Sequence, residues 1–192
     1  SGFRDTGCLF IGSAVGSLSD RVLRIVDKGH DRADVQRVLE LTREAGITLR
    51  PSLLPFTPWT TLEDQRDLLD WVSGEGLEEQ VDPVQLSIRL LVPPGSLLLD
   101  HPEMREHLGT FDPQGFTWRW QHPDPRLDDL QRRTHALVSE AAMQDQDPRL
   151  TLVALRGLAD EIAGVLPRSR SVSRGEVEPR RRVPRLTEPW FC

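Results

Sequence analysis

The chain has 192 residues, of which 38% are hydrophobic and 28% are charged, as is ordinary for a globular protein with its own core. Its net charge of −6 at pH 7 argues against nucleic-acid binding, because phosphate recognition needs a basic face. No apolar run approaches the roughly 20 residues that cross a bilayer, so no membrane partner is expected.

The charge is distributed unevenly along the chain. Residues 168–192 carry seven Arg and three Glu, which leaves −10 for residues 1–167. Because this segment has few apolar side chains, we predict a disordered Arg-rich tail over 167–192, although its Arg could instead contact an anionic partner. The two cysteines, Cys8 and Cys192, lie far apart, so no disulfide is expected and a reducing, cytoplasmic location is predicted.

The first half alternates short apolar runs with helical patterns, which predicts an α/β fold with a parallel sheet and helical crossovers. Strands are predicted at 8–15, 47–56 and 84–92. Helices are predicted from 17 to 28, from 31 to 45 and, after a capping box at Thr60–Glu63, to 73. The side chains expected to face the core from the first two helices are Val22, Leu23, Ile25, Val26, Val35, Val38, Leu39 and Thr42.

The pattern changes after residue 96. Residues 110–125 hold several aromatic side chains and several Pro, which favours an irregular or short β segment whose aromatics either pack a core or line a pocket. Two helices are predicted at 126–143 and 148–165. Their apolar stripes consist of Leu127, Leu130, Leu137 and Val138 in the first, and Leu152, Val153, Leu155, Leu158 and Ile162 in the second.

Polar side chains follow the predicted strands, at the edge where parallel sheets bind ligands. They are Ser13 and Ser17 on the first strand, Arg50 and Ser52 on the second, and Ser87 and Arg89 on the third. Two arginines suit a carboxylate or phosphate, because each guanidinium offers a planar fork of donors. The alternative is that Arg50 and Arg89 are structural ion-pair partners. The histidines have no metal-ligand spacing, and no metal site is predicted.

An ordered series of segments resembles the middle of radical S-adenosylmethionine enzymes: Gly16–Leu23, Lys28–His30, Leu41–Ile47, Thr60–Asp64 and Gln85–Leu98. The resemblance covers about 7–100. It implies the fourth to sixth strands of a barrel, so we expect 1–100 to be the C-terminal half of a partial (β/α) TIM-type barrel. We expect 101–166 to be a mainly helical C-terminal extension over the barrel mouth.

The same resemblance implies the chemistry. Such enzymes hold a [4Fe–4S] cluster through a Cys-x3-Cys-x2-Cys loop, receive an electron from a donor, and cleave S-adenosylmethionine to a radical that abstracts hydrogen from substrate. Ser13 or Ser17, Arg50 or Ser52, and Ser87 or Arg89 are then expected to contact the cofactor. The substrate, a small molecule or a peptide, is not identified.

The chain departs from the family at two places. Gly16 stands where the family commonly has Glu or Gln before the Ser of the fourth strand. The cluster loop is absent, and Cys8 is predicted to be a small buried residue in a strand. We therefore expect this chain to be a fragment that is inactive by itself and supplies no metal ligand.

The C-terminal part resembles one group within that family. His122-Pro-Asp-Pro-Arg126 and the segment 183–192 look like the CUAEP/CCAEP-tail radical S-adenosylmethionine proteins, in which a Sec or Cys follows the position of Cys192. Our hypothesis is an in-frame UGA read as a stop, which makes the intact protein a selenoprotein with Cys192 in a redox pair. Two other functions stay open: a non-catalytic half-barrel that binds a partner, and another barrel enzyme that holds an anionic ligand with Arg50 and Arg89.

Overall fold

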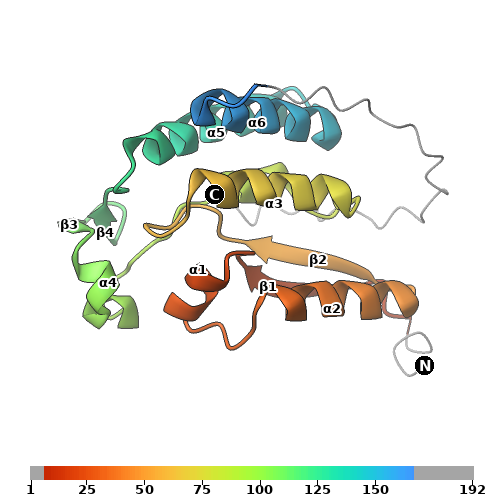
Figure 1. Ribbon diagram of the computed structural model, residues 1–192, viewed down its shortest axis with the longest axis horizontal. Helices are drawn as coiled ribbons and strands as arrows, with labels where there is room; N and C mark the ends of the chain where they lie inside the picture. Colours follow the sequence, from red (N-terminus) through yellow and green to blue (C-terminus); the bar gives the residue numbers. More distant parts are fainter. Residues whose placement is uncertain (1–6, 167–192) are drawn as a thin grey trace.

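A computed structural model describes residues 7–166 of the chain. Figure 1 shows helices and a small sheet stacked in layers: α2 lies against β1 and β2, α3 lies on the other side, and α5 and α6 are outermost. The predicted α/β character is confirmed. The disorder predicted for 167–192 and the redox role predicted for Cys192 fall outside the described residues.

The sheet begins with two parallel strands, β1 (Phe10–Gly16) and β2 (Thr48–Leu53), in which Gly12 lies opposite Arg50. Helices α1 (Asp20–Ile25) and α2 (Arg32–Glu44) connect them. The second helix starts at a capping box between Asp31 and Asp34, close to the predicted start. Cys8 precedes β1 and is half-buried, so its expected place as a buried strand residue is wrong.

The strand predicted over 84–92 is largely absent, and this corrects the sequence analysis. The 3-10 helix η2 (Pro83–Ser87) replaces its first half, because the Asp82 carboxylate accepts the Val84 N–H and Pro83 favours a helical start. A single parallel bridge joins Phe56 to Arg89. The described residues therefore form a two-stranded parallel sheet with one bridge and no closed barrel, and the half-barrel stays a prediction.

Helix α3 (Leu62–Gly74) begins one residue later than predicted. Thr61 and Asp64 form its capping box, not Thr60 and Glu63. The reason is that Thr60 is buried and its hydroxyl lies 2.8 Å from the Thr57 hydroxyl, so this side chain closes the preceding loop. Thr61 is left to accept the Asp64 N–H.

The second half holds short elements followed by a helical pair. The short elements are η3 (Leu97–Asp100), α4 (Pro102–Arg105) and a hairpin of β3 (Leu108–Asp112) and β4 (Thr117–Trp120). The hairpin confirms the short β segment predicted there. The pair consists of α5 (Pro125–Met143) and α6 (Pro148–Ala163), within a few residues of their predicted bounds. No helix in residues 7–166 combines the length and apolarity needed to span a membrane.

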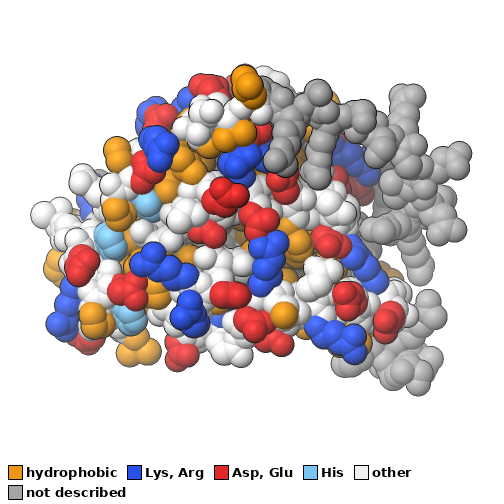
Figure 2. Space-filling model, in the orientation of Figure 1, with side chains coloured by type: hydrophobic (Ala, Val, Ile, Leu, Met, Phe, Trp, Pro, Cys, Tyr) orange, Lys and Arg blue, Asp and Glu red, His pale blue; other side chains and the backbone are white. Residues whose placement is uncertain are grey.

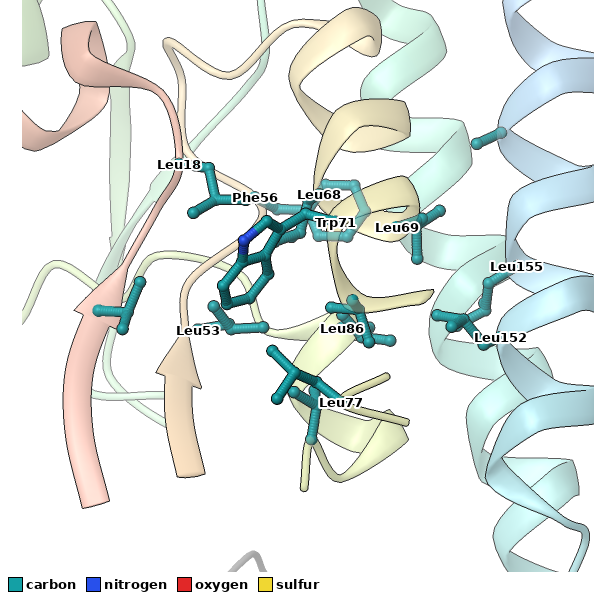
Figure 3. Close-up of a cluster of buried hydrophobic side chains, with 14 of the residues drawn as sticks. Leu18, Leu53, Phe56, Leu68, Leu69, Trp71, Leu77, Leu86, Leu152 and Leu155 are labelled. Carbon is teal, nitrogen blue, oxygen red and sulfur yellow. The ribbon is translucent and has the colours of Figure 1, made fainter. Parts of the chain in front are cut away.

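One hydrophobic cluster joins both halves of the chain (Figure 3). The cluster extends from Leu53 and Phe56 through Trp71 of α3 to Leu152 and Leu155 of α6. A second cluster beside α1 and α4 contains Trp59, Met104 and Trp120, so the aromatics of β4 mainly pack a core. Two predicted core residues are wrong: Val38 is 41% exposed and Val153 is 65% exposed, because each lies beside the buried stripe of its helix.

Ion pairs with little exposure also fasten α6 to α3. The Asp160 carboxylate accepts from Arg66 Nε at 2.8 Å and from Arg156 at 2.5 Å. The Arg156 guanidinium in turn donates to both carboxylate oxygens of Asp70 at 2.9 and 3.0 Å. Since the side chain of Asp160 is only 9% exposed, its two arginine partners compensate the cost of burying its charge.

Candidate functional site

The first two predicted site residues lie in β1 and in the turn that follows it. Ser13 is half-buried within the strand. Ser17 is buried, and its hydroxyl oxygen accepts the backbone N–H of Ser19 at 3.1 Å. Ser17 therefore has a structural hydrogen bond at the carboxyl end of β1.

The predicted site residues on β2 share the face opposite to its buried side chains. Leu49, Pro51 and Leu53 are buried, whereas Arg50 is half-buried and Ser52 is exposed. The Arg50 guanidinium lies over the Phe10 ring of the neighbouring strand, 4.8 Å from its centroid. This cation–π contact spans the two strands close to the point where Gly12 is paired with Arg50.

The predicted site residues of the third segment are engaged within the protein. The Ser87 hydroxyl donates to the Val84 carbonyl at 2.8 Å. Arg89 donates to the Asp128 carboxylate at 2.5 Å and to the Trp120 carbonyl at 2.6 Å. Arg89 is thus the structural ion-pair partner that the sequence analysis kept as an alternative.

A cleft of about 500 Å³ opens at the carboxyl edge of the sheet. Figure 1 shows β2 pointing toward this end of the molecule, where α1, α4 and the hairpin lie, and Figure 2 shows histidine side chains at the same end. The loop before α3, the first turn of α5, α1 and the end of α4 supply its walls. None of the six predicted site residues lines it, so the structure does not bring them together there.

His122 joins the two helix starts that border the cleft. Its Nε2 lies 2.8 Å from the Thr60 carbonyl, and its Nδ1 lies 2.9 Å from the Asp124 backbone nitrogen. Nδ1 also lies 3.0 Å from the Asp124 carbonyl, so the ring contacts backbone groups of both segments. His122 therefore fixes the start of α5 against the loop that precedes α3.

Both arginines in the cleft wall are paired. Arg21 donates to Glu103 of α4 at 3.0 Å, and Arg126 donates to Asp124 at 2.7 Å. The hydrogen bond from Arg126 lowers the pKa of Asp124, so this carboxylate stays ionised at neutral pH. Glu63 has only a distant contact with Arg66 at 3.9 Å, and Glu106 has no ion pair among residues 7–166.

His107 lies between these charges. Partial burial is the main cause that lowers its pKa, and the positive charge of Arg21 lowers the pKa further, whereas Glu106 and Glu103 raise it. The ring is therefore neutral at pH 7 and offers one donor and one acceptor to the cleft.

Trp59 forms part of the cleft wall and is 3% exposed. Its ring contacts the His101 ring edge-on, with centroids 6.5 Å apart. Within the described part of the chain, no group accepts a hydrogen bond from its buried indole N–H, and His101 Nδ1 is likewise without a partner. Buried polar atoms in this state are unusual and call for an explanation.

The cleft has no signature in the sequence, although two of its components do. The segment from His122 to Arg126 carries a family resemblance, and the sequence near Thr60 predicts a helix start. Four segments far apart in sequence form the cleft, so no local spacing indicates it. Within residues 7–166, no group of three or more His, Cys, Asp or Glu side chains could hold a metal ion.

Comparison with known proteins identifies no family. No family model, no curated protein and no solved structure matches the chain.

Proposed function

We propose that this chain is part of a radical S-adenosylmethionine enzyme and supplies consecutive parallel strands with their covering helices. The observation that carries the proposal is the neighbour order. β1 pairs with β2, and Phe56, just beyond β2, makes a parallel bridge to Arg89 in the next extended segment. In a (β/α) barrel each strand lies beside its successor with a helix between them, and the ordered motif series supports the same reading.

The residues of this chain do not fit the iron–sulfur cluster of such an enzyme. A [4Fe–4S] cluster needs several cysteine thiolates, and the chain has two cysteines, one near each end. The cluster would belong to other residues of the enzyme, and no step through it is derived from this chain. Ser17, Ser87 and Arg89 form hydrogen bonds within the protein, and Arg50 contacts the Phe10 ring, so Ser13 and Ser52 remain the proposed cofactor contacts.

The test uses the coding sequence on both sides of this chain and the longer protein that it encodes. We expect a three-cysteine loop upstream, and we expect the anaerobically reconstituted protein to release deoxyadenosine from S-adenosylmethionine when reduced. A variant with the three cysteines changed to Ala is the control. A gene without the loop, or a reconstituted protein that releases no deoxyadenosine, would contradict the proposal.

The second candidate function is a non-catalytic binding domain, which the cleft favours because it excludes all six predicted cofactor residues. In that case the longer protein binds a ligand in the cleft and yields no deoxyadenosine. The same assay therefore separates the two functions.

A further inference from the structure

Helix α6 is apolar on two faces, and residues 7–166 cover only one of them. The covered face includes Leu152, Leu155 and Leu158, which belong to the cluster shared with α3 and α5. On the other face, Leu150 is 62% exposed and Val153 is 65% exposed. A surface helix normally presents polar side chains to water, so this second apolar face indicates a surface that another molecule covers.

The second face is a continuous stripe. Leu150, Val153, Ala154 and Gly157 are all exposed and follow the spacing i, i+3, i+4, i+7, which places them side by side on the helix. We call these four residues the outer stripe. None of them carries a charge, and none lines the cleft. Figure 1 shows α6 in the outermost layer of the molecule, away from the sheet.

Gly157 gives an independent indication of a close contact. It lies in the interior of α6, where glycine stabilises a helix less than alanine does. Its φ is not positive, and a Cβ added there would have no atom within 4 Å in the described part of the chain. Neither the backbone conformation nor the packing inside the chain therefore requires glycine, whereas a second backbone approaching from outside would require it.

The order of side-chain sizes along the outer stripe indicates what approaches. The two large side chains, Leu150 and Val153, lie in its amino-terminal half, and the two small residues, Ala154 and Gly157, lie in its carboxyl-terminal half. A surface that fits must therefore present small residues first and large ones second. The outer stripe of a second copy has this order when it runs antiparallel, because Leu150 then meets Gly157 and Val153 meets Ala154.

The charges beside the outer stripe have the same symmetry. Arg149 lies at its amino-terminal end and Glu161 lies beyond its carboxyl-terminal end, and both are exposed. Each forms an exposed ion pair within the chain, with Glu79 and Arg133 respectively, so the surroundings of the stripe are locally neutral although the whole chain is negative. An antiparallel copy brings ends of opposite charge together, whereas a parallel copy would bring like charges together.

We propose that the outer stripe is a self-association surface, on which α6 packs antiparallel against α6 of a second copy. The two-fold axis passes between Val153 and Ala154, and each Gly157 receives Leu150 of the other copy. Four residues on one helix make a small interface, so the dimer is weak and depends on concentration. The inference goes beyond the proposed function, because the outer stripe contains no proposed cofactor contact and self-association needs no cluster.

Sedimentation equilibrium of the full chain measures the dimer. Cys8 and Cys192 are kept reduced, so that no disulfide links two copies. We expect the average mass to rise from one chain toward two between about 10 µM and about 1 mM, as suits one small contact. The mass of one chain at every concentration would overturn the inference, since a different partner would then cover the stripe.

A charged variant tests the location of the contact. Val153→Glu should abolish the rise in mass, because it places two carboxylates beside the two-fold axis. Val38→Glu is the matched control, since it makes the same change at a valine that is 41% exposed on α2 and should leave the rise intact. Circular dichroism checks that both variants are folded. Equal loss of association in the two variants would overturn the assignment to α6.

A second variant separates a role between copies from a role within one chain. Gly157→Gln should weaken association about tenfold, because the added side chain overfills the contact. It should not lower the unfolding midpoint of the single chain, because glutamine is the better helix former and the space around this position is open. Unchanged association would overturn the close approach of the two helices.

Crosslinking tests the two-fold axis. Ala154→Cys, combined with Cys8→Ser and Cys192→Ser, should give a disulfide-linked dimer on mild oxidation, because the two copies of this position lie beside the axis. Ala136→Cys, at an exposed position of α5, is the control and should give little dimer. Preferential crosslinking at Ala136→Cys would overturn the proposed geometry. None of these measurements depends on cleavage of S-adenosylmethionine, so failure here is distinguishable from failure of the proposed function.

Discussion

The Arg89 guanidinium lies over the Trp120 ring, 3.6 Å from its centroid. The same arginine donates to the Trp120 carbonyl, and the Trp120 indole donates to the Leu90 carbonyl at 2.8 Å. These contacts fasten the hairpin to the segment that bridges Phe56. Arg89, which its sequence position suggests for ligand binding, thus holds the hairpin against this segment.

The first prediction concerns this contact. Arg89→Ala should lower the free energy of unfolding by about 2 kcal/mol, because a charge-assisted hydrogen bond and a cation–π contact are lost. Arg89→Lys should recover only part of this loss, since an ammonium lacks the planar fork. Urea unfolding measures both, with Arg37→Ala on the exposed face of α2 as control. Equal stability of Arg89→Ala and the control would show that the contact contributes nothing.

The second prediction concerns the carboxylate shared by α3 and α6. Asp160→Asn should destabilise the protein by about 3 kcal/mol, because Arg66 and Arg156 then lose a shared partner that has little exposure. Glu161→Gln is the neighbouring control. Its pair with Arg133 is exposed to solvent and is expected to contribute little to stability. Similar unfolding midpoints for Asp160→Asn and Glu161→Gln would show that the Asp160 carboxylate does not stabilise the contact between α3 and α6.

Helix boundaries were largely predictable because their signals are local. Asp31 with Asp34, Asp124 before Pro125, and Asp147 before Pro148 each cap a helix start within a few residues. The prediction of a third strand over 84–92 was largely wrong for a related reason. Local capping by Asp82 stabilises a 3-10 turn where apolar composition alone indicates a strand.

The role of Arg89 and the cleft could not be predicted in this way. The partner of Arg89, Asp128, lies 39 residues along the chain, and nothing in the spacing of the two indicates contact. In the cleft, Thr60 meets His122 across 62 residues. Such sites depend on tertiary packing, and residue spacing within a single sequence gives no signal for it.

The third prediction concerns His122. His122→Ala should destabilise the protein by about 2 kcal/mol, because the Thr60 carbonyl and the Asp124 N–H both lose their partner. Hydrogen exchange should accelerate first in the opening turn of α5. The exposed His135, on the same helix, provides the control through His135→Ala. Unchanged exchange in that turn would mean that His122 does not fix the helix start.

The fourth prediction concerns pH. Because burial lowers the pKa of His107 from 6.5, its titration midpoint in the folded protein should lie below 6.5. The unfolded chain then binds the proton more readily, so stability should fall as pH drops through 6.5 toward the folded pKa. NMR titration measures the midpoint, and His107→Gln should remove this part of the pH dependence. A midpoint at or above 6.5 would contradict the stated effect of burial.

The last prediction concerns Gly16, which stands where the resembling family commonly has Glu or Gln. Its φ of 76° lies in the left-handed region, and a Cβ there would come within 2.9 Å of Lys28 Cε. The lysine end can move, so the backbone conformation accounts for most of the cost. Gly16→Ala and Gly16→Glu should therefore both destabilise the protein by about 1 kcal/mol. Gly12→Ala is the matched control, since no atom lies within 4 Å of its added Cβ. If Gly16→Glu were as stable as the parent chain, the left-handed backbone conformation at this position would not exclude a side chain.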